Sequence, residues 1–465
     1  MRTRAKMPEM TTPIVDFVRR YEKSNAVRLH MPGHKGVGSL GVESADITEI
    51  DGADSLYEAH GIIRESEENA SGLFGCPTFY SAEGSSLAIR AMLYLACLGA
   101  REREKKPLVL AARNCHKTFV SAAALLDIDV MWLYPPAGGS YLSCRVTPDE
   151  LGAALDASGR LPDAVYITSP DYLGNTSDIA GLAAVCHSRG IPLLVDNAHG
   201  AYLRFLPRSR HPIDLGADAC CDSAHKTLPV LTGGAYLHIS PGAPRGFLDG
   251  ARRALALFGS TSPSYLILAS LDAANRELAG DFPARLYDMS RRVAALREEL
   301  TAHGFEFCGD EEMKLTLAAR PWGYTGAEIA HALYEGGVVP EFYDPDYLVL
   351  MLSPSNSASD LSRLEKILAA LPRRPTEDIL PPLPGTPRAA MRIREAIMSP
   401  AESVPVSHAE GRVLADTSVG CPPAVPIAVS GEIIDKDAVR CFEYYGIESC
   451  TVTTDPNNRK GASKC

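Results

Sequence analysis

Short apolar runs alternate with longer segments of helical periodicity over residues 79–228. Each run has the length of a β-strand and ends at a turn or at a group of polar residues. The expected strands are residues 107–112, 130–133, 164–168, 192–195 and 216–221. Helices are expected over residues 84–97, 119–126 and 177–187. Strands that alternate with helices through short loops predict βαβ units, and therefore an α/β domain with a mostly parallel sheet.

Helical periodicity also marks segments outside this region. Residues 12–22 have an amphipathic pattern with Pro13 near its start, which predicts a short helix. A second amphipathic helix is indicated by apolar residues at spacings of three and four: Leu286, Met289, Val293, Leu296 and Leu300. It leads into another α/β region, and the prolines of residues 372–387 then predict a linker.

These patterns predict the order of domains along the chain. Residues 1–55 are expected to form an N-terminal helix and an active-site loop segment. The large domain is expected over residues 56–275 and a smaller α/β domain over residues 276–371. After the linker of residues 372–387, residues 388–465 are expected to form a small C-terminal α+β domain with a disordered tail.

Polar residues stand at the carboxyl ends of several expected strands. His116 follows the strand of residues 107–112, Asp196 follows residues 192–195, and Lys226 follows residues 216–221. Parallel sheets bind ligands beyond the carboxyl ends of their strands. These side chains are therefore expected to gather at one site, although the sequence separates them widely.

Lys226 and the segment Gly84-Ser-Ser86 are the two features that suggest chemistry. A buried ammonium is costly, and a Schiff base with an aldehyde cofactor would remove that cost at Lys226. A surface lysine after a strand is the alternative. Gly84, Ser85 and Ser86 are expected at a helix N-terminus, which suits a phosphate group. An ordinary serine N-cap is the alternative there.

Composition and charge exclude several classes of function. The net charge of −11 argues against general binding of nucleic acids or of anionic membranes. The chain lacks a long apolar run and an apolar leader segment, and its 12 cysteines show no metal-binding spacing. His30 and His34 lack an evident third ligand, so no metal site is expected. These features predict a cytoplasmic protein with reduced thiols.

Several longer motifs follow one another along almost the whole chain. They are Met31-Pro-Gly-His-Lys-Gly36, Asp46-Ile-Thr-Glu-Ile50, Gly84-Ser-Ser86, Arg113-Asn-Cys-His-Lys117, Asp196-Asn-Ala-His-Gly200, Ser223-Ala-His-Lys226, Pro422-Pro423 and Gly431-Glu432. With these motifs the chain resembles the short form of the ornithine/lysine/arginine decarboxylase family. The resemblance implies a fold of the pyridoxal phosphate (PLP)-dependent transferase type, fold type I, with a smaller α/β domain and a C-terminal α+β domain.

The resemblance also implies a role for each matching residue. The residues expected to be catalytic are Lys226, His116, Asp196 and His199. Lys226 would form the Schiff base, Asp196 would pair with the pyridinium nitrogen, and His116 would stack on the ring. The cofactor-binding set adds Gly84, Ser85, Ser86, Ser223, His225 and Thr261. Thr261 would reach the phosphate bound by the neighbouring subunit, so a homodimer or higher oligomer with shared sites is expected.

The activity implied is decarboxylation of a basic amino acid through a quinonoid intermediate, with a role in polyamine biosynthesis. Arginine is favoured, giving agmatine, ahead of lysine giving cadaverine and ornithine giving putrescine. Glu341 is the expected substrate-binding residue. Carboxylates that could bind the distal group of the substrate are Asp51, Asp54, Asp344 and Asp346. Another fold-type-I reaction, such as transamination, aldol cleavage or β-elimination, is the alternative, followed by a non-catalytic scaffold.

Two segments depart from the pattern of the family. Glu83 precedes Gly84-Ser-Ser86 and brings a negative charge next to an expected phosphate site, so its side chain is expected to point away. Residues 421–426 read Cys-Pro-Pro-Ala-Val-Pro, where tyrosine commonly precedes the two prolines. The departures indicate a divergent subgroup and weaken the transfer of a particular substrate.

Overall fold

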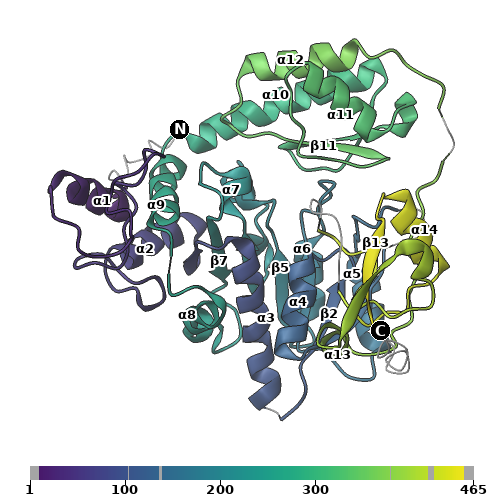
Figure 1. Ribbon diagram of the computed structural model, residues 1–465, viewed down its shortest axis with the longest axis horizontal. Helices are drawn as coiled ribbons and strands as arrows, with labels where there is room; N and C mark the ends of the chain where they lie inside the picture. Colours follow the sequence, from purple (N-terminus) through teal and green to yellow (C-terminus); the bar gives the residue numbers. More distant parts are fainter. Residues whose placement is uncertain (1–9, 103, 136–138, 377–378, 417–423, 455–465) are drawn as a thin grey trace, which may run out of the picture. The chain divides into compact units, whose positions relative to one another are not determined.

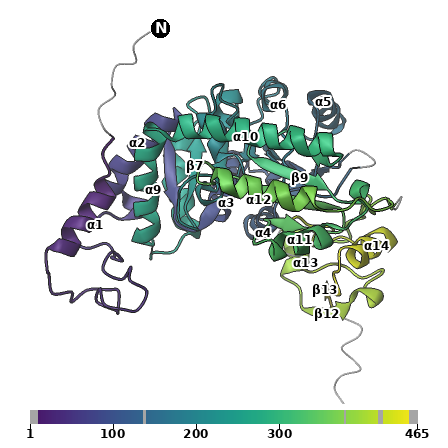
Figure 2. The same cartoon turned by 90° about the horizontal axis from the view of Figure 1, so that it is seen from above.

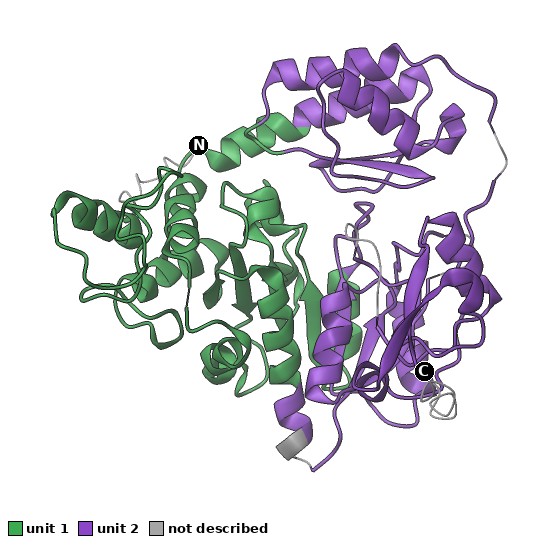
Figure 3. Ribbon diagram, viewed as in Figure 1, with its two compact units in different colours: residues 1–96, 179–290, 353–355 green, residues 97–178, 291–352, 356–465 purple. Residues whose placement is uncertain are grey.

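The structure is a computed structural model that describes residues 10–454, except residues 103, 136–138, 377–378 and 417–423. The motif Pro422-Pro423 and the expected disordered tail from residue 455 lie outside the described residues. Contacts divide the chain into two units (Figure 3). The first contains residues 1–96, 179–290 and 353–355, and the second contains residues 97–178, 291–352 and 356–465. The predicted domain borders remain a prediction.

The first unit is built on strands β1 (Thr78–Ser81), β5 (Leu193–Asp196), β6 (Ala219–Asp222) and β7 (Ala235–Ile239). Their order is β1-β7-β6-β5. Strands β5 and β6 are parallel, whereas β7 runs antiparallel to both β6 and β1. Every residue of the four strands is buried. This explains why the strands predicted from sequence are continuous apolar runs rather than alternating ones.

Helices of 4 to 22 residues belong wholly or partly to the first unit. They are α1 (Pro13–Lys23), α2 (Ile62–Phe74), α3 (Gly84–Glu102), α6 (Ile179–His187), α7 (Ala224–Thr227), α8 (Phe247–Phe258), α9 (Tyr265–Ala279) and α10 (Phe282–His303), with α3 and α10 continuing into the second unit. Helices α1, α2 and α9 lie side by side (Figures 1 and 2). The short helix predicted near Pro13 and the amphipathic helix predicted from Leu286 are both present.

The second unit contains a parallel set of strands and an antiparallel sheet. Strands β2 (Leu108–Ala112), β3 (Asp129–Leu133) and β4 (Ala164–Thr168) are ordered β4-β2-β3 and are parallel. Helices α4 (Lys117–Leu126) and α5 (Pro148–Ala157) belong to this part. The antiparallel sheet has the order β10-β11-β9-β8. Its strands are β8 (Glu306–Cys308), β9 (Lys314–Ala318), β10 (Phe342–Tyr343) and β11 (Tyr347–Met351). The helices of the same region are α11 (Gly326–Glu335) and α12 (Ala358–Ala369).

The end of the chain forms an α+β region of the second unit. Its elements are α13 (Ile393–Ile397), β12 (Ala401–Pro405), α14 (Lys436–Tyr444) and β13 (Ser449–Thr453). Strands β12 and β13 pair antiparallel. A buried ion pair between Arg113 and Glu432, 2.9 Å long, joins this region to the segment after β2. The fold class expected from the sequence is confirmed.

Ten cysteines among the described residues are free thiols, and all except Cys308 are buried. They are spread over both units and have no disulfide partner in the described part of the chain. Within the same residues, no helix has the length and apolar character needed to cross a membrane.

Candidate active site

The start of helix α3 brings together two serine hydroxyls in the first unit. Gly84 has φ of +71°, a left-handed conformation that glycine adopts without strain, and its N–H donates to Gly233 O at 2.7 Å. The Ser223 hydroxyl, which follows β6, donates to Ser85 Oγ at 2.7 Å. Helix α3 begins at Gly84, as the sequence predicts. The positive end of the helix dipole together with the neighbouring hydroxyls makes this helix start suited to a phosphate.

Asp196 is the last residue of β5, and its carboxylate is buried. The residue is 2% exposed, and Oδ1 accepts a hydrogen bond from Ala198 N at 3.2 Å. Cys221 pairs with Asp196 in the β5–β6 register, and its Sγ lies 3.5 Å from the same oxygen. The strand register is the signal that identifies this contact. A carboxylate buried in this way favours a cationic partner.

Lys226 lies in the four-residue helix α7 rather than directly at the end of a strand. Its Nζ is 3.0 Å from Nε2 of His199, which is 6% exposed. One of these two nitrogens must be unprotonated for a hydrogen bond to form between them. The contact therefore places an imidazole, which can accept or donate a proton, next to the lysine that is expected to be the reactive centre.

His225 is hydrogen-bonded to the turn before β7. Both its backbone N–H and its Nδ1 lie within hydrogen-bonding distance of Gly234 O, at 3.2 Å and 3.0 Å. Because a carbonyl oxygen only accepts, Nδ1 carries the proton in this contact. These bonds hold the Ser223-to-Lys226 segment against the glycine pair that also receives the Gly84 N–H.

His116 and Glu341 lie in the second unit. The backbone N–H of Thr118 donates to Nδ1 of His116 at 3.1 Å, so His116 caps helix α4 with that nitrogen. The Tyr172 hydroxyl donates to Oε1 of Glu341 at 3.1 Å. The expected approach of His116 and Glu341 to Lys226 remains a prediction.

Glu83 binds the loop between α8 and α9, which also carries Thr261. The backbone N–H of Ser260 donates to Oε1 of Glu83 at 2.6 Å, and Thr261 next to it is exposed. The Glu83 carboxylate thus binds a loop amide of its own chain. The role of Thr261 across a subunit boundary stays a prediction.

The other acidic candidates have structural contacts of their own. Asp54, 3% exposed, accepts hydrogen bonds from the backbone of His60 and Gly61 at the start of α2. Asp346, 5% exposed, accepts one from the Tyr444 hydroxyl at 2.6 Å. Burial raises the pKa of Asp344 to about 6. Asp54 and Asp346 are therefore buried and hydrogen-bonded within the chain.

Comparison with solved structures first establishes the class of fold. The chain superposes on the constitutive lysine decarboxylase of Escherichia coli with a TM-score of 0.75, over 96% of this chain and 82% of that chain. The two sequences are 19% identical, so this similarity shows the fold alone.

The sequence comparisons then identify the family. Residues 12–308 match the major domain of Orn/Lys/Arg decarboxylases, and residues 379–451 match their C-terminal domain. The chain belongs to the Orn/Lys/Arg decarboxylase family. It is 31% identical to an arginine decarboxylase of Halalkalibacterium halodurans over 91% of each chain. It is 28% identical to an arginine decarboxylase of Bacillus subtilis over 93% of each. The resemblance stated from the sequence motifs, and with it the expectation of a decarboxylase, is confirmed.

Proposed function

We propose that this protein is a PLP-dependent decarboxylase of a basic amino acid, with arginine as the favoured substrate and agmatine as its product. The contact between Lys226 and His199 carries the proposal, because it supplies a primary amine and an adjacent proton acceptor in a family of decarboxylases. Arginine is favoured because relatives that match over more than nine-tenths of the chain are named arginine decarboxylases.

The groups in the first unit fit each part of pyridoxal phosphate. Ser85, Ser223 and the start of α3 suit its phosphate. The buried carboxylate of Asp196 suits a protonated ring nitrogen, and Lys226 suits the aldehyde carbon. When bound, the cofactor supplies an electron sink for the electron pair that remains on the substrate after loss of CO2.

Residues of the chain transfer the proton and orient the cofactor ring. Lys226 must lose a proton to act as a nucleophile, and His199 Nε2, 3.0 Å from Nζ, is placed to accept it. After CO2 has left, the same pair can return a proton to the substrate carbon. The buried carboxylate of Asp196, which accepts a hydrogen bond from the backbone N–H of Ala198, would pair with a protonated ring nitrogen of the cofactor.

A product assay tests the reaction and the substrate together. Purified protein with PLP is incubated with arginine, lysine and ornithine, and both CO2 and amine products are measured. We expect agmatine and CO2 from arginine in excess of the other products. Lys226→Ala should abolish both, whereas Lys366→Ala, at an exposed position of α12, should not change them. Keto acids without CO2 would refute decarboxylation and favour transamination.

We also propose that the active unit is a homodimer. Large apolar side chains between residues 27 and 42 are 45–91% exposed in the single chain: Val27, Leu29, Met31, Val37, Leu40 and Val42. A second copy of the chain would cover this apolar segment, and the family resemblance assigns Thr261 to the partner's phosphate. Cofactor binding and assembly would then be coupled by mass action.

Subunit exchange tests whether the sites are shared. Lys226→Ala and Thr261→Trp chains should each be inactive or weak alone. In a mixed dimer with shared sites, one site carries both lesions and the other carries neither. We expect activity to recover when the two variants exchange subunits. Exchange shown by mass spectrometry without any recovery, or full activity of the wild-type protein as a monomer, would contradict the proposal.

A further inference from the structure

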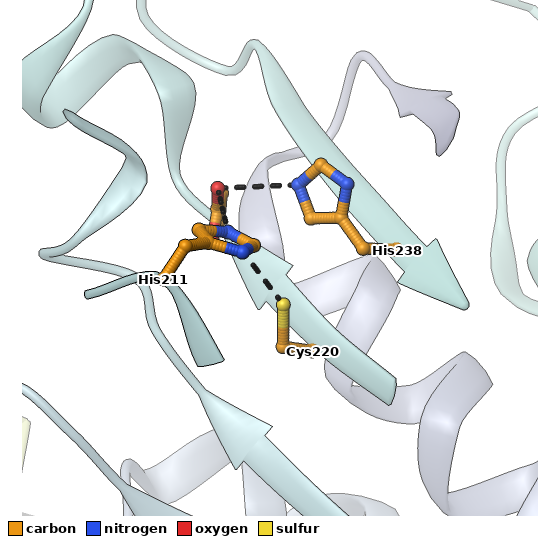
Figure 4. A group of neighbouring side chains, drawn as sticks. His211, Cys220 and His238 are labelled. Carbon is orange, nitrogen blue, oxygen red and sulfur yellow. Dashed lines mark hydrogen bonds and ion pairs between the residues drawn. The ribbon is translucent and has the colours of Figure 1, made fainter. Parts of the chain in front are cut away.

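A cluster of four metal-ligating side chains lies buried in the first unit. His211, Cys220, Asp222 and His238 are each 0% exposed, and their ligand atoms all lie within 4.8 Å of one another (Figure 4). Cys220 and Asp222 are two residues apart in β6, so their side chains lie on the same face of the strand. His238 in β7 pairs with Cys220 in register, and His211 precedes the turn at residues 212–215.

The distances agree with the coordination of one small ion. Asp222 Oδ2 is 3.1 Å from Nε2 of both His211 and His238, and Cys220 Sγ is 3.8 Å from Nε2 of His211. Around a tetrahedral zinc ion, bonds of about 2.0–2.3 Å place neighbouring ligand atoms about 3.3–3.8 Å apart. Small side-chain movements would therefore close the four ligands on one ion.

Neighbouring residues orient two of the ligands from outside the cluster. The amide group of Asn197 donates to Asp222 Oδ1 at 2.6 Å, which leaves Oδ2 for the cluster. The Thr78 hydroxyl donates to Cys76 O at 3.0 Å, so its oxygen can accept from His238 Nδ1 at 2.9 Å. A proton on Nδ1 directs the lone pair of Nε2 into the cluster. Such bonds behind histidine and carboxylate ligands are typical of metal sites.

The charges of the cluster also favour an ion. One carboxylate, one thiolate and two neutral imidazoles sum to a charge of −2. A divalent cation therefore makes this fully buried site electrically neutral.

We propose that His211, Cys220, Asp222 and His238 form a structural zinc site. All four positions of a tetrahedral ion are filled by the protein, which is the arrangement of structural rather than catalytic sites. Asn197 is next to Asp196 in the chain, and Asp222 is next to Ser223. The ion would thus support the strand ends that carry the proposed cofactor-binding residues, and this role does not depend on the reaction that they perform.

Metal analysis tests the site without any measurement of activity. The wild-type holoenzyme is produced with zinc in the medium, dialysed against a weak chelator and analysed by mass spectrometry for zinc per chain. We expect about one zinc per chain, as four protein ligands bind a structural ion tightly. Cys220→Ser should lower retention at least tenfold, and Thr78→Val should weaken affinity about 10- to 100-fold. Cys186→Ser, at another buried cysteine outside the cluster, should retain the wild-type content.

Cobalt substitution provides a second measurement that needs no variant. A tetrahedral cobalt site with a thiolate ligand should give long-wavelength absorbance bands in the wild-type protein, and Cys186→Ser should share them. Wild-type protein that holds no zinc after growth with zinc or after refolding with zinc would overturn the proposal. Equal zinc content in wild type and folded Cys220→Ser would also overturn it. The four side chains would then form a hydrogen-bonded network without metal.

Discussion

The ion pair between Arg113 and Glu432 is expected to be important for the stability of the second unit. Both side chains are 5% exposed, and Arg113 Nη2 donates to Glu432 Oε2 at 2.9 Å and to Ile427 O at 3.2 Å. Glu432 Oε2 also accepts from Val429 N at 2.7 Å. The pair connects the segment that carries His116 to the C-terminal region. Glu432→Gln retains the shape and an acceptor for Val429 N, but it removes the charge that Arg113 requires.

The expected cost follows from the distance and the burial. Two unit charges 2.9 Å apart attract by about 6 kcal/mol at an effective dielectric constant of about 20. Removal of one partner leaves the other charge buried, which typically costs about 3–5 kcal/mol. We therefore expect Glu432→Gln to lower the free energy of unfolding by that amount. The double variant Arg113→Met/Glu432→Gln should recover most of the loss, because no charge is then left without a partner.

Trp132 provides the assay, because the Arg113 guanidinium lies 5.1 Å from its ring centre. The chain has two tryptophans, so a Trp322→Phe background makes fluorescence in urea report on Trp132. The same background serves all variants. A loss below about 1 kcal/mol for Glu432→Gln would refute the reasoning, since it falls well under the cost of a broken buried pair. Single-variant losses that simply add in the double variant would refute it as well.

Three further predictions concern the first unit. Asp196→Asn should retain part of its PLP by absorbance but lose at least about 100-fold in kcat, because a neutral amide no longer stabilises a protonated ring nitrogen. Ser223→Ala should raise the Kd for PLP about 3- to 10-fold, measured by fluorescence titration, through loss of one hydroxyl near the phosphate. Burial raises the pKa of Asp272 to about 6. The protonated form of Asp272 therefore adds about 3 kcal/mol to the free energy of unfolding at pH values below its ordinary pKa. This contribution is lost as the pH rises through about 6. Asp272→Asn should flatten this dependence in urea unfolding measured from pH 4 to 7.

The sequence predicted the elements whose patterns are local. Apolar runs gave β2, β4 and β5 to within a residue or two, because strands buried on both faces need no partner to be recognised. Strand β5, which ends at Asp196, pairs with β6, which precedes Lys226, and the expected grouping of these two side chains stays a prediction. Helix α7 was not predicted, because four residues are too few to show a helical period.

The sequence does not predict contacts that depend on strand register or on the packing of distant segments. The smaller α/β region was expected without a strand direction, and its sheet is antiparallel. Asp346 stands in a turn-rich acidic segment, yet the Tyr444 hydroxyl, 98 positions along the chain, binds it. The four residues of the proposed zinc site are 9, 2 and 16 positions apart, and only the pairing of β6 with β7 brings them together.

The labelling rates of the buried thiols can measure how fast each unit of the chain opens. A thiol reagent in solution reacts only with a cysteine that a local or global opening has exposed. The cysteines Cys76, Cys186 and Cys221 report on the first unit, and Cys115, Cys144, Cys441 and Cys450 report on the second. Pulsed labelling followed by peptide mass spectrometry would therefore give separate opening rates for the two units under native conditions. Added PLP should slow the reaction of Cys221, next to Asp196, more than that of Cys441.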